Sequence, residues 1–288
     1  MTRGVASRSE GSPRSRPGRV VLPTALLIMI IPCLAARAQV AGSPLPTVNR
    51  PSGVVSTVPP ESGPRERVVA ASVARAFFRQ SLNCLGIAVR ASAAVDDRAL
   101  TLVCDKIRMM LKNIPRVRET LVRRGTELHI IGQHEQTSDL PEFRNQQDKV
   151  FVDNTGRLAL IDERARGLGG HFPSCGEENI LRLPDDRYRG HEICIHEFAH
   201  AIMDYGMTAA ERKQIRDQYT ESISIGLWDR AYAGTNPQEY WAELSVWYFG
   251  GHGDRRMNGK PPADGQVGLR VYDRRGFDLL DRLYNAAE

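Results

Sequence analysis

Hydrophobic residues recur along much of the chain with the three-to-four-residue spacing of amphipathic helices. The first such pattern begins near residue 65 and includes Val68, Val69, Val73, Phe77 and Phe78. The same spacing predicts further helices over 97–112, 116–124, 192–205, 209–225, 237–249 and 274–287. Short apolar or alternating runs predict strands around 128–130, at 149–153 and at 180–183. The pattern therefore predicts an α+β fold in which helices come first, a small mixed sheet follows, and further helices end the domain.

The first 64 residues show no such pattern. Basic residues precede an apolar run at 20–34, and Ala36–Arg37–Ala38 follows it, an order typical of a secretory signal peptide over residues 1–38. The run contains two prolines and is shorter than the roughly 20 residues that cross a bilayer, which disfavours a permanent anchor. Residues 39–64 are rich in Pro, Gly and Ser and predict a disordered linker. We therefore expect one domain over residues 65–288, secreted or periplasmic, without stable membrane insertion after cleavage.

Composition supports a folded domain and argues against a nucleic-acid partner. The 288 residues are 41% hydrophobic and 25% charged, which is ordinary for a globular protein. The formal net charge of +5 belongs to the leader, because residues 39–288 hold 33 basic and 33 acidic side chains. A neutral domain offers no excess of charge to neutralise phosphates.

Four cysteines remain after the expected cleavage, and an even number in an exported protein predicts two disulfides. Proximity in sequence favours pairing Cys84 with Cys104 and Cys175 with Cys194. Three connectivities are possible, and buried reduced thiols are the alternative. No pair has the close spacing of a zinc finger.

The segment His196-Glu197-Phe198-Ala199-His200 is an HExxH pattern inside a predicted helix. Residues four apart lie on the same helical face, so both imidazoles can bind one Zn²⁺ ion. Glu197 cannot be a third ligand from that face, but it can reach a water molecule on the open side of the metal as general base. Apolar neighbours place the segment on a buried helix, where unpaired ionisable groups would be costly. A surface helix with incidental His and Glu is the alternative.

A catalytic zinc needs a third protein ligand. Met203 and Gly206 stand where the extended metzincin motif needs Gly and His, which excludes that class. The predicted helix at 237–249 carries Glu239 and Glu243 four residues apart on one face. One glutamate should bind zinc and the other should orient a metal-binding histidine. Asp204, one turn after the motif, is another candidate for such a supporting role.

Two pieces of sequence resemble the metallopeptidase domain of the anthrax lethal factor type, a gluzincin. One is the pentapeptide at 196–200; the other is Tyr232, seven residues before Glu239, followed by Glu239-x-x-Ala242-Glu243. The resemblance covers about residues 190–250 and implies a zincin-like fold with the HExxH segment on a central helix. It also implies that Glu239 is the third zinc ligand, that Tyr232 stabilises the oxyanion, and that Glu243 supports a ligand histidine. Nothing resembles the toxin's receptor-binding or substrate-docking regions, so toxin activity is not implied.

Other polar residues carry weaker signals. Three residues flank the Gly-rich turn at 167–170 and either line the cleft or are exposed in loops: His171, Glu177 and Glu178. His191–Glu192 is interpreted as the start of the motif helix. Three further histidines have no partner at ligand spacing and should be structural or solvated: His129, His134 and His252. The predicted strand at 180–183 is a candidate rim for a peptide substrate, and the stretch 250–268 is a predicted surface loop.

The main hypothesis is a secreted zinc-dependent endopeptidase acting on a peptide or protein substrate, with Glu197 as general base. A catalytically silent exported metal-binding or interaction module is a second possibility, although it would not need Glu197. A zinc hydrolase of a non-peptide amide is a third, and the metal site alone does not distinguish it. The sequence does not indicate an oligomeric state.

Overall fold

The computed structural model describes residues 72–152 and 158–286. Contacts divide the chain into a unit of residues 1–54 and a unit of residues 55–288, and every described residue belongs to the second. The predicted signal peptide and linker lie outside the described residues. Among the described helices, none combines the length and apolar character needed to cross a membrane.

The main sheet has five short strands in the order β1-β2-β3-β7-β6. The strands are β1 (Gln80–Cys84), β2 (Ile87–Ala91), β3 (Glu127–Ile131), β6 (Gly167–Leu168) and β7 (Ser174–Gly176). The β1–β2 and β6–β7 pairs are antiparallel, whereas β3 runs parallel to both β2 and β7. A separate antiparallel pair consists of β4 (Val150–Val152) and β5 (Leu158–Leu160). The predicted α+β fold with a small mixed sheet is confirmed.

Helices make up most of the remaining described chain. The longer ones are α2 (Asp97–Leu111), α3 (Pro115–Arg124), α6 (Ile193–Ala201), α7 (Ala209–Ser224), α8 (Pro237–Tyr248), α9 (Gly265–Tyr272) and α10 (Arg274–Tyr284). Short helical turns are α4 (Ile161–Arg164) and α5 (Glu177–Ile180), and residues 72–77 are also helical. The predicted helix at 192–205 is α-helical to Ala201 and continues as a π-helical turn over Ile202–Gly206.

Local capping signals set the starts of the helices around the predicted site. Thr208 accepts a hydrogen bond from the backbone N–H of Glu211, whose side chain accepts one from Thr208 in return, and this capping box begins α7. The Asn236 side chain accepts from the N–H of Glu239 at 2.8 Å, and Pro237 occupies the first helical position of α8. Residue type at these positions thus marks where α7 and α8 begin.

The expectation that helices precede the sheet is wrong, because the hairpin β1–β2 precedes α2. Its two-residue turn has positive φ at both Leu85 (54°) and Gly86 (91°), which matches the twist of a tight hairpin. Ile87, Val89 and Ala91 alternate toward the core. Each strand has only five residues, and a two-residue turn joins them. The alternation of apolar and polar residues was therefore too short to be distinguished from the helical pattern upstream.

Three further sequence predictions are wrong in whole or in part. Residues 180–183 are not a strand: Ile180 ends the helical turn α5 and buries its side chain there, and Arg182 has a positive φ of 57°. Apolar character at that point reports burial and not a strand. The predicted loop at 250–268 already contains the start of α9 at Gly265. In the first predicted helix, Phe78 lies past the helical turns, while Val68 and Val69 lie outside the described residues.

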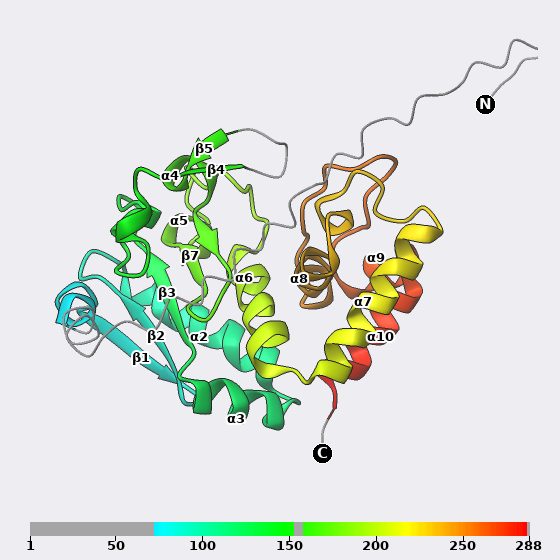
Figure 1. Cartoon of the computed structure of the whole chain (residues 1–288), viewed down its shortest axis with the longest axis horizontal. Helices are drawn as coiled ribbons and strands as arrows, with labels where there is room; N and C mark the ends of the chain where they lie inside the picture. Colours follow the sequence, from blue (N-terminus) through cyan, green and yellow to red (C-terminus); the bar gives the residue numbers. More distant parts are fainter. Residues whose placement is uncertain (1–71, 153–157, 287–288) are drawn as a thin grey trace, which may run out of the picture. The chain divides into compact units, whose positions relative to one another are not determined.

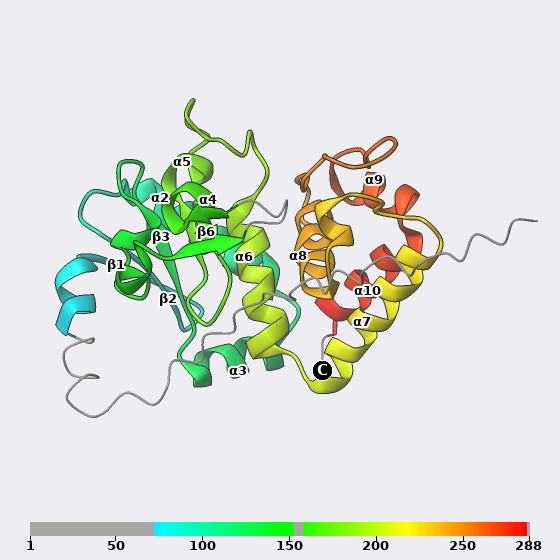
Figure 2. The ribbon, with the colours of Figure 1, turned by 45° about the horizontal axis from the view of Figure 1, so that its top comes forward.

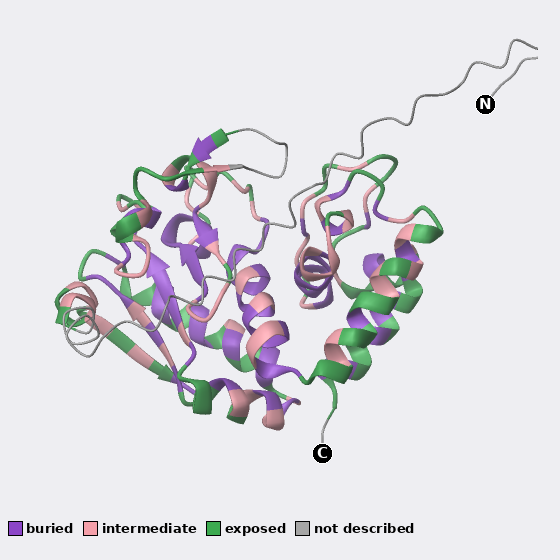
Figure 3. Cartoon of the chain, viewed as in Figure 1, coloured by how far each residue is buried: buried purple, intermediate pink, exposed green. Residues whose placement is uncertain are grey.

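Helix α8 is the centre of the helical half of the domain and lies beside α6 (Figures 1 and 2). Helices α2 and α6 pack against the sheet, whereas α7, α9 and α10 pack around α8. Figure 3 shows α8 almost wholly buried, and its Trp241 and Trp247 are fully enclosed. The α6–α8 contact therefore lies inside the domain.

Two disulfides join the sheet to the helices, as the spacing of the cysteines favoured. Cys84–Cys104 joins β1 to α2, and Cys175–Cys194 joins β7 to the first turn of α6. Closing loops of about 20 residues typically contributes about 3 kcal/mol per bridge. The second bridge holds α6 against the sheet two residues before His196.

Candidate metal centre

Three side chains from α6 and α8 bring their ligand atoms together. His196 Nε2 lies 3.1 Å from Glu239 Oε2 and 3.2 Å from His200 Nε2, and His200 Nε2 lies 3.4 Å from Glu239 Oε2. Zinc bound tetrahedrally with ligand bonds of 2.0–2.1 Å separates its ligand atoms by about 3.3 Å. The triangle of nitrogen and oxygen atoms therefore fits one such ion.

The packing of the two helices explains this convergence. His196 and His200 face the same way on successive turns of α6. Glu239 lies in the first turn of α8, which the Asn236 cap begins. The indole N–H of Trp241, fully buried, donates to the backbone oxygen of Ala199 at 2.9 Å and fixes α8 against α6.

The charges of the three groups are strongly coupled. Burial lowers the pKa of His196, but its contacts with Glu239 and Glu243 raise that pKa well above its ordinary value. Burial likewise lowers the pKa of His200, but the Glu239 carboxylate raises it by more, so the pKa of His200 lies above its ordinary value. Burial would raise the pKa of Glu239, yet the two histidines hold it far below its usual range. The site therefore favours positive charge, which protons or a divalent cation can supply.

Glu197 and Tyr232 lie next to this triangle. Glu197 is half-buried, and burial raises its pKa although positive charge on His196 and His200 opposes the increase. Tyr232 lies in the 3₁₀ turn Tyr232–Gly234 before α8, and its ring is stacked on that of His196 with centroids 5.8 Å apart. Both predicted catalytic residues thus lie close to His196, the first histidine of the motif.

Glu243, one turn beyond Glu239 on α8, is fully buried beneath His196. Its Oε1 lies 2.9 Å from His196 Nδ1 and 3.1 Å from His191 Nε2, and its Oε2 accepts a hydrogen bond from the N–H of Asp254 at 2.6 Å. The two histidine distances fit hydrogen bonds, although the ring N–H directions are not aligned with the oxygen. Burial would raise the pKa of Glu243, but the charge and contact of His191, followed by those of His196, hold it well below its usual range.

His191 is the residue that sequence reasoning missed. It does precede the first residue of α6, as predicted, but its buried ring reaches α8. It stands five positions before His196, so helical periodicity gives no reason to place the two side chains together. The one signal in the sequence was that a histidine, a residue type able to bind metals or donate hydrogen bonds, stands close to the HExxH motif.

The Gly-rich segment at 167–170 packs directly on α6, the helix that carries the HExxH motif. A Cβ atom on Gly167 would lie 2.4 Å from Ile193, and one on Gly169 would lie 3.0–3.2 Å from the His200 side chain. A side chain at 167 would force Ile193 to shift, and one at 169 would crowd His200, so glycine suits both positions. The sheet edge beside α6 is therefore β6, and the predicted rim at 180–183 is wrong.

The other flagged residues have structural roles. Glu177 accepts from the backbone N–H groups of Asp96 and Gln133, and Glu178 pairs with the guanidinium of Arg166 at 2.7 Å. Both glutamates are buried, so neither is an exposed loop residue. The ring of His171 donates to the backbone oxygen of residue 124 at 2.8 Å.

Two histidines expected to be structural or solvated have local partners. His129 lies between Glu142, at 2.5 Å, and Glu127, at 3.2 Å. The Nδ1 atom of His252 lies 3.0 Å from the backbone oxygen of Gly253. Asp204 is half-buried in the π-helical turn, where burial raises its pKa against the opposing charge of His200.

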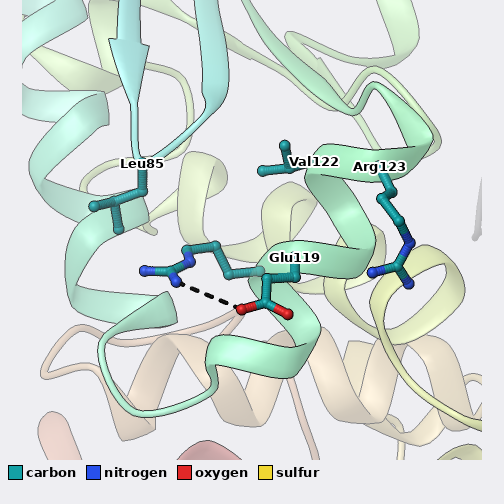
Figure 4. A pocket seen from close by; sticks show the side chains of 5 residues that line it. Leu85, Glu119, Val122 and Arg123 are labelled. Carbon is teal, nitrogen blue, oxygen red and sulfur yellow. Dashed lines mark ion pairs between the residues drawn. The ribbon is translucent and has the colours of Figure 1, made fainter.

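A separate surface hollow lies between the β1–β2 turn and α3 and shares no residue with the metal centre (Figure 4). Exposed Leu85 and Val122 line it together with three charged side chains of α3: Arg118, Glu119 and Arg123. Its one ion pair joins Arg118 to Glu119 at 4.0 Å, at the limit of contact. Exposed pairs of this kind contribute little energy.

No protein-family model matches this sequence, and no curated protein matches it either. Among solved structures, the fold is similar to that of the PRO-PRO endopeptidase (PPEP-2) from Paenibacillus alvei, with a TM-score of 0.50 and 15% identity. The likeness covers 70% of this chain and all of that one. The resemblance to the lethal factor type in particular stays a prediction from residues 190–250. At this identity the comparison establishes architecture: the chain has an α+β fold similar to that of an endopeptidase.

Proposed function

We propose that this protein is a zinc-dependent endopeptidase. The observation that carries the proposal is the triangle formed by His196 Nε2, His200 Nε2 and Glu239 Oε2, whose edges of 3.1–3.4 Å suit one tetrahedral ion. The fold similarity to an endopeptidase supports the same conclusion. The two-imidazole, one-carboxylate ligand set, together with the HExxH pattern, supports zinc as the metal.

A zinc ion held by these three side chains would supply Lewis-acid polarisation of a carbonyl and acidify a water molecule. Glu197 takes the proton of the attacking water and passes it to the nitrogen of the departing amine. The hydroxyl of Tyr232 donates to the oxygen of the tetrahedral intermediate. Glu243 Oε1 accepts a hydrogen bond from the Nδ1–H of His196, which leaves Nε2 of that ring free for the metal.

The peptide substrate binds along β6, the outermost strand on this side of the sheet. A strand in that place can pair with an extended peptide through its backbone, and Gly169 brings the following segment against His200. The two disulfides support export of the protein, because such bonds persist in oxidising compartments.

Metal content tests the ligand set. Purified wild type should hold one zinc ion per chain, and His196→Ala and Glu239→Gln should lose it. Glu119→Gln is the matched control, because that carboxylate is exposed on α3. Zinc retained in Glu239→Gln and lost in Glu243→Gln would reassign the third ligand.

Cleavage-site profiling with a diverse peptide library tests the reaction. We expect wild type to cut internal peptide bonds, and Glu197→Gln to bind zinc normally but to cleave at least about 100-fold more slowly, as loss of a general base predicts. Wild type that binds zinc without any Glu197-dependent cleavage would instead indicate a silent module or a hydrolase of another amide.

A further inference from the structure

The carboxylate of Glu243 meets groups from two other parts of the chain. One oxygen faces His196 and His191, and the other accepts the backbone N–H of Asp254 in the segment after α8. No surface of Glu243 is exposed to solvent. A buried carboxylate needs several donors to offset its desolvation, so each of these three groups matters to its position.

The backbone around His191 is firmly held. The side-chain amide of Asn179 donates to the carbonyl oxygen of His191 at 2.8 Å. The next residue, Glu192, is buried and pairs with Lys106 at 2.6 Å and with Arg182. The imidazole therefore starts from a fixed point, and its Nε2 lies 3.1 Å from Glu243 Oε1 on α8.

The chemistry of imidazole sets the direction of this contact. A neutral His196 that gives Nε2 to a metal keeps its proton on Nδ1, which faces Glu243. His191 Nε2 lies 3.1 Å from the same oxygen, close enough to become a second N–H donor once its N–H turns toward Glu243 Oε1. The three atoms His191 Nε2, His196 Nδ1 and Glu243 Oε1 are also close enough to hold a cation themselves. That alternative requires His196 to bind metal through both nitrogens, which a neutral ring cannot do.

We propose that His191 is a positioning residue of the metal centre: together with the N–H of Asp254, it fixes the Glu243 carboxylate in the orientation that aligns His196 for zinc. This inference rests on the proposed metal site. It adds a contact in which a residue outside the HExxH segment controls the geometry of its first histidine through a second helix.

Zinc affinity, measured by competition with a chromophoric chelator, tests the proposal without any substrate. His191→Leu removes the donor at similar volume, and His191→Gln keeps an N–H close to the position of Nε2. We expect His191→Leu to weaken zinc binding about 10-fold or more, as loss of a ligand's supporting partner does, and His191→Gln to recover most of that loss. In the cobalt-substituted protein, the visible absorption bands should shift for Leu and return toward wild type for Gln.

His129→Leu is the control for general destabilisation, because it removes another buried histidine that contacts two carboxylates away from the site. Its zinc affinity should equal that of wild type. The effect of His191→Leu should also disappear in a Glu243→Gln background, since His191 acts through that carboxylate. A full effect of His191→Leu in that background would overturn the proposal.

The remaining outcomes separate this inference from the proposed function. Wild-type affinity in His191→Leu, with one zinc per chain, would overturn the role of His191 and leave the ligand set standing. Two zinc ions per wild-type chain, one of them lost in His191→Leu, would replace positioning by a second metal site. Wild type that binds no zinc more tightly than His196→Ala would overturn the proposed function and this inference together.

Discussion

Replacing Gly253 by alanine should damage both the fold and the metal centre. A Cβ atom there would lie 2.2 Å from Glu243 Oε2 and 2.3 Å from the indole of Trp247, both on fully buried side chains. Ordinary contacts between such atoms are 3.5–4.0 Å, so one of the partners must move by about 1 Å or more. Gly253 is not among the glycines with positive φ, so the backbone conformation itself does not oppose alanine.

The magnitude follows from two separate effects. Overpacking a closed interior costs about 1–3 kcal/mol. Displacing the segment from Glu243 also breaks its 2.6 Å hydrogen bond with the N–H of Asp254, and a hydrogen bond to a charged group is worth about 1.5–3 kcal/mol. We therefore expect Gly253→Ala to lose roughly 2.5–6 kcal/mol of unfolding free energy, equivalent to a fall in Tm of roughly 5–24 °C for a domain of this size.

Urea unfolding followed by circular dichroism measures the loss of unfolding free energy. Chelator competition measures the expected loss of zinc affinity. Gly259→Ala is the matched control in the same segment: its φ is 77°, and a Cβ there meets no atom within 4 Å. This variant carries backbone strain alone and should leave zinc affinity unchanged. Gly253→Ala with wild-type stability and zinc affinity would refute the reasoning.

Three further measurements test other parts of the structure. Burial lowers the pKa of His129, but Glu127 and Glu142 raise it above its ordinary 6.5. The ion pairs of His129 with these two glutamates therefore stabilise the fold fully below about pH 6.5, and this stabilisation is lost as pH rises through the raised pKa. Unfolding free energies of wild type and His129→Gln should converge above that range, and parallel pH profiles would contradict this. Asp273→Asn should cost about 1.5–3 kcal/mol for each charged hydrogen bond lost, since this buried carboxylate accepts from the indole of Trp228 at 2.8 Å; an unchanged urea midpoint would be evidence against it. Adding a chelator should lower Tm in wild type and not in His196→Ala. A metal ion present at about 1,000 times its Kd stabilises the folded state by about 4 kcal/mol.

Sequence alone determined the features that depend on one element at a time. The spacing of His196 and His200 places them on one face of a helix, and the Asn236 cap sets the register that brings Glu239 to the first turn of α8. Proximity along the chain favoured the two cysteine pairings that the structure shows, although it left three connectivities open. The roles of these site residues in binding and catalysis stay predictions until metal content and cleavage are measured.

Only the tertiary structure decided which segments surround that pair of helices. His191, Gly253 and Gly169 have no common period with the motif, yet all three lie against Glu243 or His200 once α6, α8 and β6 are packed. The strand predicted at 180–183 failed for the related reason that apolar residues report burial without saying against what. Periodicity specifies the buried face of each element, whereas the partner of that face is set by how all the elements fill one interior.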